Sequence, residues 1–240
     1  MSAPLAPLVF LPGWCVGRTP LRAAAEALNG RIFDLPGYGD APSVADFYAA
    51  ADDIAARLQP GSTLAGWSLG AQLALAVAAR RPDRVGKLLL VAGTASFVQR
   101  DAWPHAMPPA MLAEFASAVA ADVEAMLPRF VGGFNRGDAR AKAVTVELLR
   151  LADPRPSGPV LATGLDWLRD VDLRDLAPLV RAPTLLIHGA ADPLMPLAAA
   201  EALAALIPDA RLAILADCAH APFISRPEEF LAAARPFLND

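Results

Sequence analysis

Short apolar runs recur along this chain of 240 residues and alternate with longer stretches that have helical spacing. Continuous apolar runs bounded by turn residues are typical of strands that are buried on both faces of a parallel sheet. The stretches between them begin near capping residues or proline, as helices do. The alternation predicts a doubly wound α/β fold. The expected strands are residues 8–11, 31–34, 62–65, 86–91, 184–188 and 211–215.

The strand pattern stops between residues 97 and 178, where proline and glycine separate four helix-like pieces. An all-helical insert between sheet strands favours a cap over the strand ends. We therefore expect a core of residues 1–96 and 179–240 and a helical cap of residues 97–178. In one core helix, Ser43 and Asp46 have capping-box spacing, so we expect that helix to begin at Ser43. The expected helices are residues 109–119, 122–134, 138–151 and 159–168 in the cap and 19–30, 43–58, 71–80, 197–207 and 227–238 in the core.

A G-x-S-x-G motif, residues 66–70, lies between an expected strand and an expected helix. In that context the motif predicts a nucleophile elbow, with Ser68 at the apex of a strained turn and glycine at both flanks. Matches of five residues also occur by chance, so the motif needs an acid and a histidine elsewhere in the chain. The spacing from Gly61 to Ser68 resembles a phosphate-binding loop, but that loop requires lysine where this chain has Trp67.

Two further residues have the types and positions that a serine nucleophile requires. Asp192 follows the strand that ends at residue 188, and His220 follows the last strand. Because ligands bind beyond the carboxyl ends of parallel strands, both turns should lie near the elbow. Histidine would remove the serine proton, and the carboxylate would orient the histidine. The acid and the histidine thus follow Ser68 in the order that a G-x-S-x-G elbow requires.

Other residues compete for these roles or support them. Asp34 or Asp217 could supply the acid in place of Asp192, whereas we expect His188 and His105 to be structural. The oxyanion would be bound by the backbone N–H of Leu69, which follows the nucleophile, and by that of Trp14 in the loop after the first strand.

Composition excludes several classes of protein. Apolar residues make up 55% of the chain and charged residues 19%, as in globular proteins. No apolar run has the ~18 to 20 residues that span a bilayer, and no signal peptide is evident, so we expect a cytoplasmic protein. Cys15 and Cys218 have neither disulfide nor zinc-site spacing, which predicts free thiols and no metal. The formal net charge of −4 does not favour nucleic acid or membrane binding.

Several motifs together resemble the α/β-hydrolase superfamily: residues 11–14, 34–39 and 66–70 and the turns that hold Asp192 and His220. Residues 100–104, 164–174 and 220–225 are similar to the BioH family, the pimeloyl-[acyl-carrier-protein] methyl ester carboxylesterases of biotin synthesis. The resemblance implies an α/β-hydrolase fold, a mostly parallel sheet of about six strands with the N-terminal hairpin trimmed, and a helical cap. This chain departs from the family at Pro12, where histidine is usual.

The resemblance also implies a substrate, a pimeloyl methyl ester carried on acyl carrier protein, with no cofactor and a monomeric enzyme. Trp14 and Phe130 would contact the substrate, and Arg129, Arg136 and Arg140 would contact the carrier. Residues 129–142 hold four cations against one carboxylate, a local net charge of +3 that suits an acidic partner. A solvated helix face remains an alternative. Two other functions are alternatives to this one. The protein could be a general short-chain carboxylesterase, or it could be a ligand-binding relative without activity.

Overall fold

The computed structural model describes residues 7–239 and contains a sheet of six strands within that range. The strand order is β2-β1-β3-β4-β5-β6, and every pair of neighbouring strands is parallel. The predicted six-stranded α/β fold is therefore confirmed. The strands are β1 (Leu8–Leu11), β2 (Arg31–Ile32), β3 (Ser62–Trp67), β4 (Val85–Val91), β5 (Thr184–Gly189) and β6 (Ala210–Leu215).

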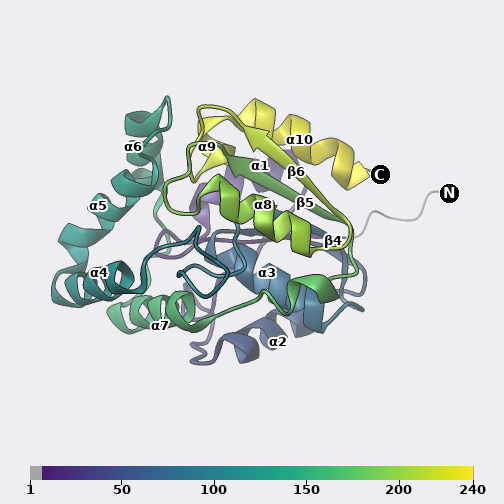
Figure 1. Ribbon diagram of the computed structural model, residues 1–240, viewed down its shortest axis with the longest axis horizontal. Coiled ribbons are helices and arrows are strands. Elements are labelled where there is room, and N and C mark those ends of the chain that lie inside the picture. The colour runs from purple at the N-terminus through teal and green to yellow at the C-terminus, as the bar shows by residue number, and fades with distance from the viewer. Residues whose placement is uncertain (1–6, 240) are drawn as a thin grey trace.

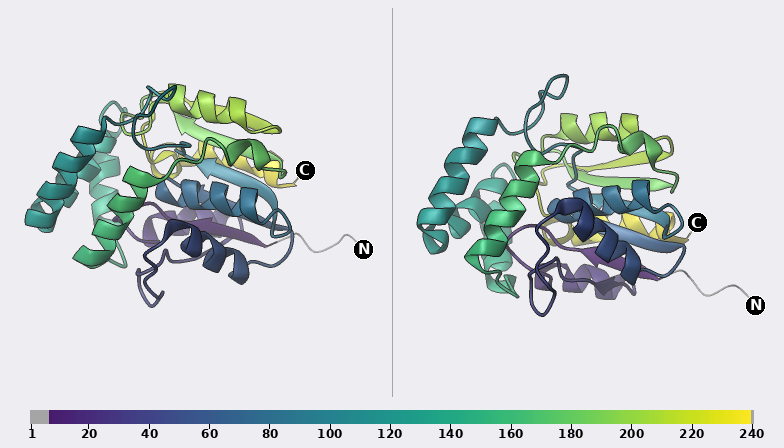
Figure 2. Two further views of the ribbon diagram at one scale, coloured as in Figure 1. Left: turned by 60° about the horizontal axis from the view of Figure 1, so that its bottom comes forward. Right: turned by 90° about the horizontal axis from the view of Figure 1, so that it is seen from below.

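Helices cover both faces of this sheet, which explains why β1, β3 and β5 are buried along their whole length. Helices α1 and α10 lie on one face, and α2, α3 and α8 lie on the other (Figures 1 and 2). The core helices are η1 (Thr19–Leu21), α1 (Arg22–Ala27), α2 (Phe47–Arg57), α3 (Leu69–Arg80), η2 (Ala177–Leu179), α8 (Leu197–Leu206), α9 (Pro222–Ser225) and α10 (Pro227–Asn239).

Two helices, α2 and α6, begin several residues later than the sequence predicts. Helix α2 begins at Phe47, because the Asp46 carboxylate accepts the N–H of Ala49 at 2.7 Å and caps the helix in place of Ser43. Helix α6 (Ala141–Leu151) begins three residues after Asp138, whose carboxylate accepts hydrogen bonds from outside the helix.

The four α-helices between β4 and β5 pack together beyond the carboxyl ends of the strands (Figure 1). They are α4 (Pro109–Ala121), α5 (Val123–Phe134), α6 and α7 (Gly158–Asp170). All four expected helices are present, and each lies within a few residues of its predicted range. We propose that residues 97–178 form the cap and that the remainder forms the core, as the sequence predicts.

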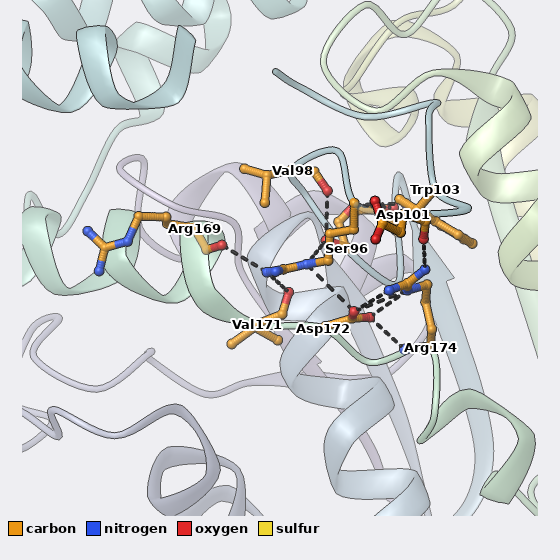
Figure 3. Close-up of polar contacts among 10 residues, drawn as sticks. Ser96, Val98, Asp101, Trp103, Arg169, Val171, Asp172 and Arg174 are labelled. Carbon is orange, nitrogen blue, oxygen red and sulfur yellow. Dashed lines mark hydrogen bonds and ion pairs between the residues drawn. The ribbon is translucent and has the colours of Figure 1, made fainter. Parts of the chain in front are cut away.

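A polar network joins the start of the cap to its end (Figure 3). Ser96 pairs with Asp172 in an antiparallel bridge. The Arg100 guanidinium donates to the Ser96 hydroxyl at 2.9 Å, and Arg174 forms an ion pair with Asp172 at 2.7 Å. The indole N–H of Trp103 donates to the Ser96 carbonyl. The two chain segments that enter and leave the cap are therefore held against each other.

Three further expectations from the sequence concern the two cysteines, membrane-spanning helices and metal sites. Cys15 and Cys218 are buried and unpaired, and burial raises the pKa of the Cys218 thiol to about 12. No helix within residues 7–239 combines the length and apolar character that a membrane crossing requires. The same residues include no cluster of three or more His, Cys, Asp or Glu side chains suited to a metal ion.

Candidate active site

Ser68 lies at the sharp turn between β3 and α3, with φ 58° and ψ −120°. Positive φ is uncommon for a residue with a side chain, so this backbone conformation is strained. A Cβ atom at Gly66 would lie 2.1 Å from the carbonyl oxygen of Gly70, and one at Gly70 would lie 2.4 Å from that of Leu11. Glycine is therefore required on both sides of Ser68, as the nucleophile-elbow interpretation predicts.

The structure brings Ser68, His220 and Asp192 together in one hydrogen-bonded row. His220 Nε2 lies 2.9 Å from the Ser68 hydroxyl, and His220 Nδ1 lies 2.7 Å from Oδ2 of Asp192. With its proton on Nδ1, the imidazole donates to the carboxylate and can accept the serine proton at Nε2. The side chains are at most 7% exposed, so water competes little for these hydrogen bonds.

The Asp192 carboxylate is fixed by its own turn. Its Oδ1 accepts the backbone N–H of Leu194 at 2.9 Å and that of Met195 at 3.0 Å. Two backbone donors stabilise the ionised carboxylate, and they aim Oδ2 at His220. The acid therefore reaches the histidine in one orientation.

The other two candidates for the acid, Asp34 and Asp217, do not contact His220. Asp34 forms an ion pair with Arg18. Burial raises the pKa of its carboxyl, and the arginine offsets only part of that rise. Asp217 is exposed and has φ 49° in the turn before His220. Of the three carboxylates, only Asp192 forms a hydrogen bond with His220.

His188 and His105 occupy positions unlike that of His220. His188 is fully buried on β5, and its Nε2 donates to the carbonyl of Met195 at 2.7 Å. Burial lowers the pKa of His188, which favours the neutral ring. His105 is exposed in the cap segment. His188 Nε2 also lies 3.7 Å from Oδ2 of Asp192, but of the three histidines only His220 forms a hydrogen bond with Ser68.

The loop after β1 lies directly against Ser68. A Cβ atom at Gly13 would lie 3.2 Å from the Ser68 Cβ, so Pro12 does not keep this loop away from the serine. The next residues are held in place, because the N–H of Cys15 donates to the hydroxyl of Tyr38 at 3.0 Å. The backbone N–H groups of Trp14 and Leu69 are not paired with a backbone carbonyl in the described structure. Both therefore remain available to an oxyanion.

Aromatic side chains close the space above Ser68. The Trp14 and Phe130 rings meet edge to face at 5.2 Å, and Phe134 lies 5.2 Å from Phe130 and 5.0 Å from the His220 ring. The cavity that they leave is only about 10 Å³, close to the space that one water molecule needs. Trp14 and Phe130, which the resemblance implies as substrate contacts, both line this cavity.

Two contacts fix Trp14 against the cap. Its indole N–H donates to the carbonyl of Leu161 on α7 at 3.0 Å. A Cβ atom at Gly164, one turn further along the same helix, would lie 2.5 Å from the Trp14 ring. The loop that offers the Trp14 N–H is therefore packed against helix α7.

The three cap arginines do not share one environment. Arg129 and Arg136 are exposed, and neither forms an ion pair with a residue in the described range 7–239. The Arg140 guanidinium donates to the carbonyl of Ser225 at 2.9 Å, at the end of α9. Arg129 and Arg136 are thus free to meet a partner, whereas Arg140 is bound to the core.

Sequence reasoning did not identify two residues that adjoin the site. Phe134 follows Phe130 by four residues, so both lie on one face of α5, and that spacing was a usable signal. Asp138 contacts the turn that holds His220, but it was counted only as a charge in the basic stretch. No local pattern points to that contact, because its partner is 81 residues away.

The serine, histidine and carboxylate at the carboxyl edge of a parallel sheet define a class of protein. The α/β hydrolase family model matches residues 8–234, and the chain belongs to that family. A solved esterase from Exiguobacterium antarcticum has the same fold, with a TM-score of 0.88 and 26% identity, and the match covers 98% of this chain and 92% of that one.

Within the family, curated relatives are more similar in sequence. A pimeloyl-[acyl-carrier protein] methyl ester esterase from Aromatoleum aromaticum is 40% identical over 92% of this chain and 94% of its own length. The protein of the same name from Nitrosomonas europaea is 37% identical over 94% and 92%. These similarities place the chain among the pimeloyl-[acyl-carrier protein] methyl ester esterases, as the resemblance in its motifs predicts.

Proposed function

We propose that the protein is a serine carboxylesterase that hydrolyses the methyl ester of a pimeloyl chain held on acyl carrier protein. The observation that carries the reaction is the hydrogen-bonded row from Ser68 through His220 to Asp192, with distances of 2.9 and 2.7 Å. The substrate is supported by the names of the relatives described above. No cofactor takes part in this chemistry.

The reaction proceeds through an acyl-enzyme. The Ser68 oxygen attacks the ester carbonyl while its proton passes to Nε2 of His220, and Asp192 stabilises the imidazolium. The N–H groups of Leu69 and Trp14 bind the oxyanion. The C–O bond to the methoxy group then breaks, and His220 returns the proton to release methanol. Water repeats the sequence and frees the acid and Ser68.

Substrate entry requires a change in the cap. A space of about 10 Å³ cannot hold a pimeloyl chain, so the aromatic side chains that close it must move. Phe130 and Phe134 come from α5, whose exposed surface also carries Arg129. We propose that the carrier docks on this side of the cap, where Arg129 and Arg136 meet its acidic groups. Arg140 adds positive charge there and is anchored by α9.

A general short-chain carboxylesterase is the second candidate. The small cavity above Ser68 favours it, since a short acyl group requires less movement of the cap. A binding protein without activity has less support, because the hydrogen bonds of the triad are already in place. We further propose that the enzyme acts as a monomer in the cytoplasm, where acyl carrier protein would be available.

One comparison of substrates tests this proposal. Methanol release is measured from pimeloyl-carrier methyl ester and, separately, from free monomethyl pimelate, with Ser68→Ala as the blank. We expect the carrier-bound ester to have the higher kcat/KM and the blank to release no methanol above background. Equal kcat/KM for both esters would support the general carboxylesterase. No hydrolysis of any ester by the parent would contradict the proposed function.

A further inference from the structure

Asp138 lies in the turn of residues 135–140, which joins α5 to α6 in the cap, yet its side chain faces the core. It is only 7% exposed, and it forms no ion pair with a residue in the described range. A buried carboxylate without a cation must be stabilised by hydrogen bonds. Its oxygen atoms indeed accept three of them.

These hydrogen bonds connect the cap to the segment that holds the histidine. Oδ2 accepts the backbone N–H of Ala219 at 2.9 Å, and Ala219 immediately precedes His220. Oδ1 accepts the hydroxyl of Ser225 at 2.8 Å, on α9 beyond the histidine. One carboxylate thus holds the segment on both sides of His220.

Two further contacts of the same turn support this attachment. The N–H of Ala139 donates to the carbonyl of Asp217 at 3.0 Å. A Cβ atom at Gly137, where φ is +93°, would lie 3.3 Å from Ala191, the residue before Asp192. The cap turn therefore lies against both the acid turn and the histidine turn.

The rings of Phe134 and Trp67 pack against the imidazole, but few hydrogen bonds orient it. Its Nδ1 is held by Asp192, and the carbonyl of His220 accepts the indole N–H of Trp67 at 2.8 Å. The hydrogen bond from Ala219 acts one peptide earlier, so its loss would let the ring shift relative to Ser68. A misplacement of about 1 Å can cost a catalytic site ~100-fold in rate.

We propose that Asp138 is a positioning residue that sets the distance between His220 and Ser68 and links it to the position of the cap. The inference rests on the proposed serine esterase function. Asp138 does not touch the substrate in this account. It acts through the backbone of Ala219 and through Ser225, so an altered cap position alters the placement of the base.

The experiment compares Asp138→Ala and Asp138→Asn with a matched control, Asp122→Ala. Asp122 is also a cap aspartate that accepts a backbone N–H, from Ala125 at 3.0 Å, but it is exposed and caps α5. Hydrolysis of p-nitrophenyl acetate is measured per active site, with sites counted by a fluorophosphonate. The proton between His220 and Asp192 is followed by its low-field NMR resonance in each folded variant.

We expect Asp138→Ala to lower kcat about 10- to 100-fold with little change in KM, because positioning and not binding is lost. Asp138→Asn should lower kcat about threefold or more, since one oxygen remains to accept from Ala219. Both should shift the low-field resonance, whereas Asp122→Ala should match the parent in both measurements.

Equal kcat per active site and an unshifted resonance in both Asp138 variants would overturn the inference. If Asp138→Ala does not fold, Asp138→Asn decides by the same two criteria. Failure of the proposed function has a different signature, since the parent would then hydrolyse no ester. The NMR comparison needs no turnover and would still test whether Asp138 places His220.

Discussion

The two sides of the candidate site are built differently. On the core side, Ser68, His220 and Asp192 are buried and joined by hydrogen bonds of 2.7 and 2.9 Å. On the cap side, the Phe130 ring stacks on Phe115 and meets Trp14 edge to face. Arg129 is exposed and forms no ion pair within the described residues. Each contact between aromatic rings contributes little free energy, so these rings can rearrange. Separating a buried carboxylate from its partner costs much more free energy.

This difference suggests a division of labour. The core side fixes the atoms that react, so its geometry must exist before the substrate arrives. The cavity between the cap and Ser68 has a volume of only about 10 Å³, so the cap side must change to admit an acyl chain. Core changes should therefore alter the reaction of every ester, whereas changes of the cap surface should alter only the choice of substrate.

Loss of the nucleophile is expected to have the largest effect. Ser68→Ala should lower kcat on the order of 10⁶-fold for carrier-bound and small esters alike, because serine and base act as one unit. The exposed cap serine variant Ser117→Ala is the control and should match the parent. Steady-state kinetics with both substrates measures the change in kcat. A Ser68→Ala kcat within tenfold of the parent would remove the nucleophile assignment.

Loss of the acid should come next. Asp192→Asn should lower kcat on the order of 10⁴-fold, because the amide favours the wrong tautomer of His220. Asp217→Asn is the matched control, and it should have little effect since Asp217 is exposed and does not contact the ring. Steady-state kinetics on p-nitrophenyl acetate measures both variants. If Asp217→Asn proved the more damaging, Asp192 would not be the acid.

The cap surface should have a smaller and selective effect. The double variant Arg129→Ala, Arg136→Ala should raise KM for the carrier-bound ester about tenfold, at ~1 kcal/mol or less for each exposed ion pair. Kinetics on p-nitrophenyl acetate should barely change, because neither side chain reaches Ser68. Arg140→Ala is tested separately, because its contact with Ser225 lies near the histidine turn. An equal change for both substrates would contradict a selective role of the cap surface.

The smallest predicted effect is on stability at acid pH. Burial lowers the pKa of His188, so below ~6.5 the unfolded chain binds a proton that the folded chain does not. This group therefore makes the protein less stable as pH falls, by up to about 1.4 kcal/mol per pH unit. His188→Gln keeps a donor for Met195 and should flatten the curve below about pH 6.5. Urea unfolding at several pH values measures it, and identical curves would contradict the prediction.

Local patterns in the sequence were sufficient for the core side. Each triad residue lies in a turn that follows a strand of the sheet, β3, β5 or β6, and parallel strands bring such turns to one edge. The glycines around Ser68 follow from the tightness of the elbow itself. These features depend on neighbours in the chain, so sequence reasoning could find them.

The cap side depended on contacts that no local pattern contains. Asp138 was expected to begin a helix, but hydrogen bonds from Ala219 and Ser225 hold its side chain against the core. Arg140 was grouped with exposed arginines, yet it is bound to the end of α9. In both cases a partner more than eighty residues away decided the position of the side chain.

The central claim is that the core side carries out the reaction and the cap surface selects the substrate. A change of ionic strength tests this claim most directly, without any variant. The measurement is kcat/KM for pimeloyl-carrier methyl ester and for p-nitrophenyl acetate, each from low to high ionic strength. Salt screens exposed charges such as Arg129 and Arg136, but it barely affects a buried triad. We predict that kcat/KM for the carrier-bound ester falls several-fold while that for the small ester stays level. A parallel fall for both substrates, or no fall for either, would contradict the account.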